Sequence, residues 1–301
     1  MNSWTIGLST GCFYRQPILD VLPAIRAEGF EDIEICSFPK HLDYHSEAEV
    51  HKAGEMILSL GLRVVSFHAP FADQIDITSF DPNQREASIA ELILACTAAA
   101  RLGARNVVLH PGPERTGRPP HDAFVLHMRH AADGLNRVAA RCCELGVQLL
   151  LENMLPHLLF GQTSDMLYLL GSINTCSVGT CLDTGHARLS GDLHQVVYKL
   201  SGHLKMVHAN DNMGDWDAHL IPGDGSIDWP WLISELKRLG FQGPLIIEMA
   251  GQNGENTSST LERALRGRLF LENLLRGQVQ AGAPHPAPTQ FRASPATLSL
   301  T

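Results

Sequence analysis

The stretch Gly179–His186 has the sequence GTCLDTGH and joins an apolar run to a carboxylate and an imidazole. Its apolar residues predict a buried strand that ends at Asp183, followed by a turn at Gly185. His186 comes three residues after the carboxylate, and carboxylate oxygen and imidazole nitrogen are common ligands of divalent metals. Asp183 could equally be the N-cap of a following helix. The pair therefore becomes informative only if other strands end in the same kind of residue.

A unit of one short apolar run followed by one helical pattern is repeated along the chain. The predicted strands span residues 6–10, 30–36, 63–68, 106–110, 147–152, 177–183, 203–208 and 244–248. The predicted helices span residues 17–29, 46–60, 84–102, 121–145, 164–170, 192–200, 229–239 and 260–275. Continuous apolar strands are typical of a parallel sheet that is buried on both faces. This repeat predicts an α/β protein with a single closed (β/α)8 TIM barrel.

An open, doubly wound sheet is the alternative fold for the same pattern. Such a sheet would carry a Gly-rich phosphate-binding turn after its first strand, and Gly11–Tyr14 (GCFY) does not supply one. After residue 276 the composition shifts to Pro, Ala, Ser and Thr, which predicts a disordered tail over residues 277–301. We therefore expect one domain, a barrel over residues 1–276, followed by that tail.

The composition is that of a globular protein, with 44% hydrophobic and 18% charged residues in 301. The formal net charge of −9 disfavours a nucleic-acid partner, because phosphate backbones repel an acidic surface. No uncharged apolar run reaches the roughly 18 residues of a membrane-spanning helix, and the N-terminus does not resemble a signal peptide. Seven scattered cysteines without a CxxC pair are typical of reduced thiols. We expect a cytoplasmic protein without membrane association.

Residues with metal-ligand side chains recur where the later predicted strands end. They are His68, His110, Glu152, Asp183 with His186, His208 with Asp211, Asp217 and His219 in the loop that follows, and Glu248. In a (β/α)8 barrel the carboxyl ends of all strands meet at one face, which is where active sites are built. A single histidine after a strand is more often structural than a ligand. A structural role for every one of these residues, at the same face, would be a rare coincidence.

Glu152 and Glu248 are the hardest of these residues to explain as structural, because each ends an apolar run. A carboxylate in such a place is costly unless a cation accompanies it. Pairing with Lys205 or with an arginine is the alternative to a bound metal. Mixed oxygen and nitrogen donors suit Mn, Zn, Co, Fe or Mg, and the lack of cysteine among them argues against a structural zinc site.

Other residues give weaker indications. Histidines that fall in predicted helices or loops are expected on the surface: His41, His45, His51, His121, His127, His130 and His194. Phe13, Phe38 and Phe71 lie in loops at the predicted open face, where they could line a pocket or pack in the core.

Seven segments of the chain resemble the xylose isomerase-like TIM-barrel superfamily, which includes sugar and sugar-phosphate isomerases and epimerases and also endonuclease IV. These segments are Ser66–Pro70 (SFHAP), Val108–Gly112 (VLHPG), Leu151–Asn153 (LEN), Leu182–His186 (LDTGH), Val207–Asn212 (VHANDN), Asp217–Gly225 (DAHLIPGDG) and Ile247–Glu248 (IE). The resemblance extends from Ile6 to Leu275. It implies a TIM barrel with a metal-dependent active site, but it does not select one reaction.

The ketose-epimerase branch of the superfamily implies one divalent metal, usually Mn, with Zn, Co, Fe and Mg as alternatives. By resemblance its ligands are Glu152, Asp183, His208 and Glu248, and the expected substrate-binding residues are His68, His110, His186 and Asp211. The two glutamates would be catalytic. One would remove a proton from the carbon beside a metal-polarised oxygen, and the other would supply a proton on the opposite face.

The endonuclease IV branch implies three zinc ions that activate a water against a DNA phosphodiester. Its ligand pattern is matched by His68, His110, Glu152, Asp183, His186, His208, Asp217, His219 and Glu248. The net charge argues against this branch, and so do a loop without arginine at Ser37–Asp43 and the carboxylates Asp73, Asp76 and Asp81.

We therefore predict a metal-dependent isomerase or epimerase of a small sugar or sugar phosphate. The alternatives are an apurinic-site endonuclease and a non-catalytic relative that binds a ligand in the same barrel. Superfamily members occur as monomers, dimers and tetramers, so a homo-oligomer is also open.

Overall fold

The computed structural model describes residues 4–174, 178–252 and 255–278 and contains a closed parallel barrel in the strand order β1 to β8, with β8 pairing β1. The strands are β1 Ile6–Ser9, β2 Asp32–Cys36, β3 Arg63–His68, β4 Asn106–Leu109, β5 Gln148–Glu152, β6 Val178–Asp183, β7 Leu204–Ala209 and β8 Leu245–Ile247. The predicted (β/α)8 barrel is thus confirmed, and the alternative open sheet is wrong. Ser177 and residues 279–301 of the predicted tail lie outside the described residues.

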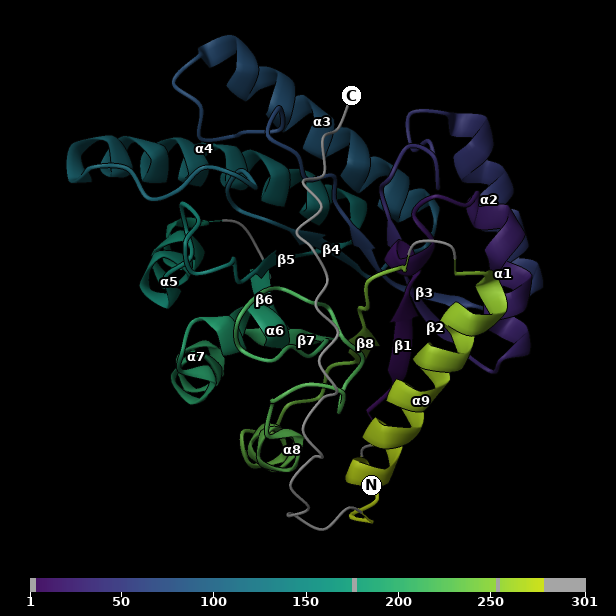
Figure 1. Ribbon diagram of the computed structural model, residues 1–301. Helices are drawn as coiled ribbons and strands as arrows, with labels where there is room; N and C mark the ends of the chain where they lie inside the picture. Colours follow the sequence, from purple (N-terminus) through teal and green to yellow (C-terminus); the bar gives the residue numbers. More distant parts are fainter. Residues whose placement is uncertain (1–3, 175–177, 253–254, 279–301) are drawn as a thin grey trace.

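Helices cover the outside of the barrel, and the long helices α3 and α4 lie side by side (Figure 1). The helical elements are η1 Thr10–Phe13, α1 Ile18–Ala27, α2 Glu47–Ser59, α3 Pro82–Arg101, α4 His121–Leu145, α5 Thr163–Ser172, α6 Thr184–Leu189, α7 Leu193–Leu200, α8 Trp229–Arg238 and α9 Thr257–Leu275. Side-chain caps begin several of them, such as Ser46 for α2 and Asp81 for α3. The sequence did not predict η1 or α6, which are short and directly follow strands.

The interior of the barrel is closed by an apolar layer, separate from the larger core between strands and helices. Its members are Val65, Val108, Leu150, Cys181, Met206 and Ile246. Successive side chains of a strand alternate in direction, so the residue two positions further points into the same interior. His110, Glu152, Asp183, His208 and Glu248 each follow a member of this layer by two residues. The barrel therefore directs these donors to one place, above an apolar floor.

The cysteines differ in part from the prediction. Cys12, Cys36, Cys96, Cys142 and Cys181 are free and buried, as expected. Cys143 is disulfide-bonded, so the prediction that all seven thiols are reduced is wrong for this residue. Cys176 lies outside the described residues. Among the described residues, the helices are too short or too polar to cross a membrane.

Candidate metal centre

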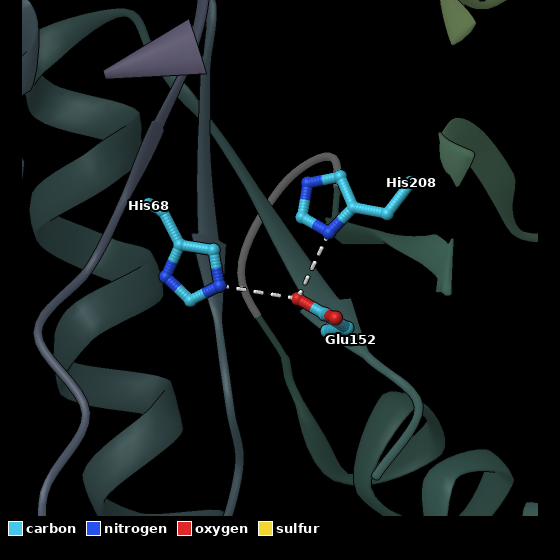
Figure 2. A group of neighbouring side chains, drawn as sticks. All are labelled: His68, Glu152 and His208. Atoms are coloured by element: carbon cyan, nitrogen blue, oxygen red, sulfur yellow. Dashed lines mark ion pairs between the residues drawn. The ribbon is translucent and has the colours of Figure 1, made fainter. Parts of the chain in front are cut away.

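Glu152 lies at the centre of the predicted donor set. Its Oε2 atom is 3.3 Å from Nε2 of His68, 3.3 Å from Nε2 of His110 and 3.3 Å from Nδ1 of His208. The imidazoles of His68 and His208 both point at this oxygen, from two different directions (Figure 2). Glu152 itself is only 1% exposed. A carboxylate is thus held at the end of β5 by histidines from β3, β7 and the loop after β4.

Four of the predicted ligands form a compact tetrad. One donor atom from each of Glu152, Asp183, His208 and Glu248 lies within 4.8 Å of the others. Nδ1 of His208 is 3.3 Å from both Glu152 Oε2 and Glu248 Oε2. These residues end neighbouring strands β5 to β8, so the order of the barrel accounts for their convergence. The tetrad is the arrangement that the sequence predicts for a single divalent ion.

A second group of donors lies beside the tetrad and shares Asp183 with it. Donor atoms of Asp183, His186 and His219 lie within 4.8 Å of one another. Asp217 joins this group, because its Oδ2 is 3.3 Å from Nε2 of His186 and 3.0 Å from Nε2 of His219. His219 has a φ of 41°, a left-handed backbone conformation that is unusual for histidine. The loop after β7 is therefore shaped around the contact between Asp217 and His219.

Asp183 caps a helix and also faces the donor set, in line with the two roles that its sequence context left open. Its Oδ1 accepts a hydrogen bond from the backbone N–H of His186 at 2.6 Å and so caps α6. Its Oδ2 accepts from the side-chain amide of Asn210 and faces the tetrad. Position 185 requires glycine, because a Cβ there would lie 2.1 Å from Asn210 Oδ1. The stretch that ends β6 thus needs Asp183 for the cap and the donor set, and a residue without Cβ at 185.

Each of four histidines of the centre is oriented by a hydrogen bond from one ring nitrogen, while the other nitrogen faces a carboxylate of the donor set. Backbone oxygens serve for two of them: Ala69 O for Nδ1 of His68 at 2.9 Å, and Asn153 O for Nδ1 of His186 at 2.8 Å. Carboxylates serve for the other two: Glu114 for Nδ1 of His110, and Glu34 for Nε2 of His208 at 2.9 Å. Such partners fix the tautomer and ring orientation of metal-binding histidines.

The sequence prediction missed four residues of this site: Glu34, Glu114, Asn153 and Asn210. Asn153 brackets the backbone of Asp183 by accepting from its N–H at 2.8 Å and donating to its carbonyl at 3.0 Å. Only Glu34 carried a usable signal, because it is a charged residue at an interior position of the otherwise apolar run Ile33–Cys36.

Several buried polar atoms of the centre have no hydrogen-bond partner among the described residues. They are His110 Nε2, His208 Nδ1, Glu152 Oε2 and Asp217 Oδ1. Burying a polar atom without a partner is costly, and such atoms in native structures call for an explanation. Three of them converge, because His110 Nε2 and His208 Nδ1 each lie 3.3 Å from Glu152 Oε2, and all four are ligand types for divalent metals. The residues therefore fit a bound divalent cation.

The surroundings of the two glutamates shift their pKa values in opposite directions. Burial raises the pKa of Glu248 to about 6, although the charge of His208 opposes the rise. Burial would also raise the pKa of Glu152, but the imidazoles of His208 and His110 hold it well below its usual range. Burial disfavours charge on His186 and His219 as well, yet nearby carboxylates raise their pKa to about 9 and about 10. Glu248, which is 16% exposed, is also the more accessible of the two glutamates.

Several sequence interpretations are corrected by these contacts. Pairing with Lys205 is wrong, because the ion pairs of Glu152 and Glu248 within the described residues are all with histidines, and Lys205 is exposed. Asp211, a predicted substrate contact, instead has contacts typical of a structural residue. Its carboxylate is buried and accepts four hydrogen bonds, from the backbone N–H groups of Asn212, Gly223 and Ile227 and from Nε1 of Trp229.

His41 is buried rather than on the surface, with Nδ1 bonded to the carbonyl oxygen of Gln16. Phe13 is a core residue, 1% exposed. Phe71 instead lies against the centre, with its ring centroid 5.0 Å from that of His68 and 5.1 Å from that of His110. Phe38 contacts Phe71 at 5.7 Å. Two of the three predicted pocket aromatics thus form an apolar wall on the β3 side of the donor set.

Fold and site together define a (β/α)8 barrel with a candidate metal centre at the carboxyl end of its strands. Residues 22–274 match the family described as xylose isomerase-like TIM barrel, and the chain belongs to this family. The resemblance inferred from the sequence segments is confirmed.

Two relatives illustrate the range of the family. The chain is 27% identical over 256 residues to an uncharacterised protein of Methanocaldococcus jannaschii, which covers 80% of this chain and 82% of the relative. It is 29% identical over 262 residues to the Mycobacterium leprae protein named "Probable endonuclease 4", and the match covers 82% of this chain and 96% of the relative.

Solved structures with similar folds carry other names. A D-tagatose 3-epimerase-like protein superposes with a TM-score of 0.79 at 23% identity, covering 91% of this chain and 98% of the other. An L-ribulose 3-epimerase superposes with a TM-score of 0.76 at 19% identity, covering 94% of this chain and 100% of the other. The IOLI protein, whose structure was solved with a zinc atom, gives 0.76 at 17% identity, covering 89% and 98%. At these identities the similarity shows the fold alone.

Proposed function

We propose that this protein is a divalent-metal-dependent isomerase or epimerase that acts on a small sugar or sugar phosphate. The observation that carries the proposal is the approach of Glu152 and Glu248 to one nitrogen of His208, at 3.3 Å each. Two carboxylates therefore converge on one imidazole nitrogen, and their pKa values are shifted in opposite directions. This is the usual arrangement for a pair that divides acid and base roles.

The two glutamates would divide the proton transfers between them. Glu152, which its lowered pKa keeps ionised, would remove a proton from the carbon beside the substrate carbonyl. Glu248, whose pKa is about 6 and which is partly exposed, carries a proton more readily and supplies one on the opposite face. Glu152, Asp183, His208 and Glu248 would hold the cation. When bound, it would polarise the substrate oxygens and so ease the loss of the proton.

A phosphodiester hydrolase with several metals is the second candidate, and one observation favours it. Asp217, His186 and His219 are brought together at 3.0–3.3 Å, although a one-metal isomerase has no need of that group as ligands. The relative named "Probable endonuclease 4" adds support. The net charge of −9 weighs against a DNA substrate. Small sugars therefore remain the first proposal.

The first test measures proton exchange. Purified protein loaded with Mn²⁺ or Zn²⁺ is incubated in D₂O with a panel of ketoses and ketose phosphates, and deuterium on the carbon beside the carbonyl is followed by NMR. We expect exchange with at least one substrate, and its loss in Glu152→Gln. Glu31→Gln is the matched control, because Glu31 is exposed and pairs with Arg63 at the opposite end of the barrel. Full exchange in Glu152→Gln would contradict the two-glutamate mechanism.

The second test separates the two candidates. The same preparations are incubated with abasic duplex DNA, with and without EDTA, while the metal-to-protein ratio is measured by elemental analysis. We expect no nicking. Metal-dependent nicking by a protein that holds three zinc ions, without proton exchange on any sugar, would replace the first proposal with the second.

A further inference from the structure

Glu34 is a carboxylate inside the barrel, on β2, and it is fully buried. Its Oε1 accepts a hydrogen bond from Oγ of Ser9 at 2.9 Å. Its Oε2 accepts from Oγ of Ser66 at 2.8 Å and from Nε2 of His208 at 2.9 Å. Within the described residues its ion pair is with His208, and no lysine or arginine reaches it. The two hydroxyls are neutral, so His208 is the route by which positive charge can approach this carboxylate.

An ionised carboxylate in such a place is expensive to keep. Its desolvation costs several kcal/mol in effect, and neutral hydroxyl donors offset only part of that cost. A glutamine of nearly the same shape would satisfy both hydroxyls without a charge. The compensating positive charge must come through the His208 ring, either as a proton on the ring or as a cation on its far side.

The ring geometry makes that connection. Nε2 donates its hydrogen to Glu34, so in the neutral form of the ring that binds a cation Nδ1 carries the lone pair. Nδ1 is the nitrogen that lies 3.3 Å from both Glu152 and Glu248. Backbone carbonyls orient His68 and His186, and the partner of His110 is the partly exposed Glu114. His208 is thus held by a buried full charge, at the point where the tetrad closes.

We propose that Glu34 is a positioning residue of the metal centre: it locks His208 with Nδ1 toward the cation and strengthens cation binding through the ring. This inference rests on the proposed metal centre. Carboxylate partners of metal-binding histidines typically change metal affinity by roughly 10- to 100-fold.

A different role must be distinguished from this one. Glu34 also links β1, β2 and β3 through Ser9 and Ser66, so it could act only as a scaffold for the barrel. Removing both hydroxyls weakens the scaffold and leaves the bond to His208 in place. Exchanging Glu34 for glutamine does the reverse, because the amide keeps partners for the hydroxyls and removes the charge that His208 faces.

The experiment titrates zinc into chelated, desalted protein in competition with a chromophoric zinc chelator. Co²⁺ absorption in the visible range reports the ligand field, and circular dichroism reports the fold. We expect Glu34→Gln to lose about 10- to 100-fold in zinc affinity with a changed Co²⁺ spectrum. The double variant Ser9→Ala/Ser66→Ala is expected to stay within about threefold of the wild type. Glu31→Gln, three residues earlier and exposed, is the matched charge control.

The outcomes separate cleanly. Wild-type affinity in Glu34→Gln, or an equal loss in the double hydroxyl variant, would overturn the role of Glu34. If Glu34→Gln does not fold, the double hydroxyl variant decides: retained affinity supports the inference and lost affinity contradicts it. In a His208→Gln background, Glu34→Gln should have no further effect, and an additive loss would contradict action through His208. A wild type that binds neither zinc nor cobalt would instead refute the metal centre itself.

Discussion

Asp183 offers the sharpest separation of structure from function in this protein, because its two oxygens have different tasks. Oδ1 caps α6 through the N–H of His186, and Oδ2 lies in the donor set beside Asn210. Asp183→Asn keeps a carbonyl oxygen for the cap and places an amide toward Asn210. Asn210 Oδ1 has no hydrogen-bond partner in the described parts of the chain, so a flip of the Asn210 amide would turn its oxygen toward the new N–H₂. Asp183→Ala removes both tasks.

The magnitudes follow from those contacts. In metal-free protein, Asp183→Ala loses a helix cap, which costs about 1 kcal/mol. It also leaves the buried amide of Asn210 without its acceptor, which costs about 1–3 kcal/mol more. With a urea m-value of about 3 kcal/mol/M, the unfolding midpoint should fall by roughly 1 M. Asp183→Asn should remain within about 1 kcal/mol of the wild type. Both variants lose a ligand of the tetrad, so zinc affinity should fall by more than about 100-fold.

The assay has two arms on the same three proteins. Urea unfolding of the chelated proteins, followed by circular dichroism, gives stability, and competition with a chromophoric chelator gives zinc affinity. We expect the asparagine variant to unfold like the wild type and to bind zinc like the alanine variant. Equal destabilisation of the two variants would refute the capping argument. Wild-type zinc affinity in the asparagine variant would refute the assignment of Asp183 as a ligand.

Three further predictions concern metal binding, the pH dependence of stability, and Asp211. Chelation should lower Tm by about 8 °C, because a cation at a thousand times its Kd contributes about 4 kcal/mol and each kcal/mol shifts Tm by about 2 °C at this size; calorimetry with and without EDTA measures it, and an unchanged Tm would contradict a bound metal. In the metal-free protein, the raised pKa values of His186 and His219 add stability that is full below the unfolded value near 6.5 and is lost as pH rises through about 9 to 10. The urea midpoint of the chelated protein should therefore fall between pH 7 and 10, and a midpoint that rises over this range would contradict the assignment. Asp211→Ala should lower the free energy of unfolding by more than about 3 kcal/mol, because it leaves four buried donors unpaired, and it should leave KM unchanged. A raised KM in a stable variant would instead support the predicted substrate contact.

The barrel and most of its donors could be predicted from the sequence because both depend on local patterns. Strand β3 and helix α4 match their predicted bounds, since Gly and Pro mark their ends and apolar periodicity marks their bodies. The donors were found because a residue that ends a strand in a barrel must lie at one face.

What the sequence did not predict depends on contacts across the barrel. Glu34 and His208 are 174 positions apart, and only closure of the sheet brings them to 2.9 Å. Asp211 has the same sequence context as a ligand, directly after a strand, but the loop after β7 folds back so that its own N–H groups saturate the carboxylate. Local patterns identify residue types at a face. They do not distinguish a side chain that faces the site from one whose hydrogen-bonding atoms are already bonded within its own loop.

Charge balance connects the two candidate functions. The carboxylates of the centre are Glu34, Glu114, Glu152, Asp183, Asp217 and Glu248, and within the described residues their ion pairs are all with histidines. Three divalent cations would balance these six charges with every imidazole neutral. One cation in the tetrad would leave four negative charges, which protonated His68, His110, His186 and His219 would offset. With pKa values of about 9 and 10, His186 and His219 hold their protons at neutral pH, so every added cation must displace protons. A cation bound beside Asp217 would therefore compete with these protons, whereas the tetrad contains neither of the two histidines.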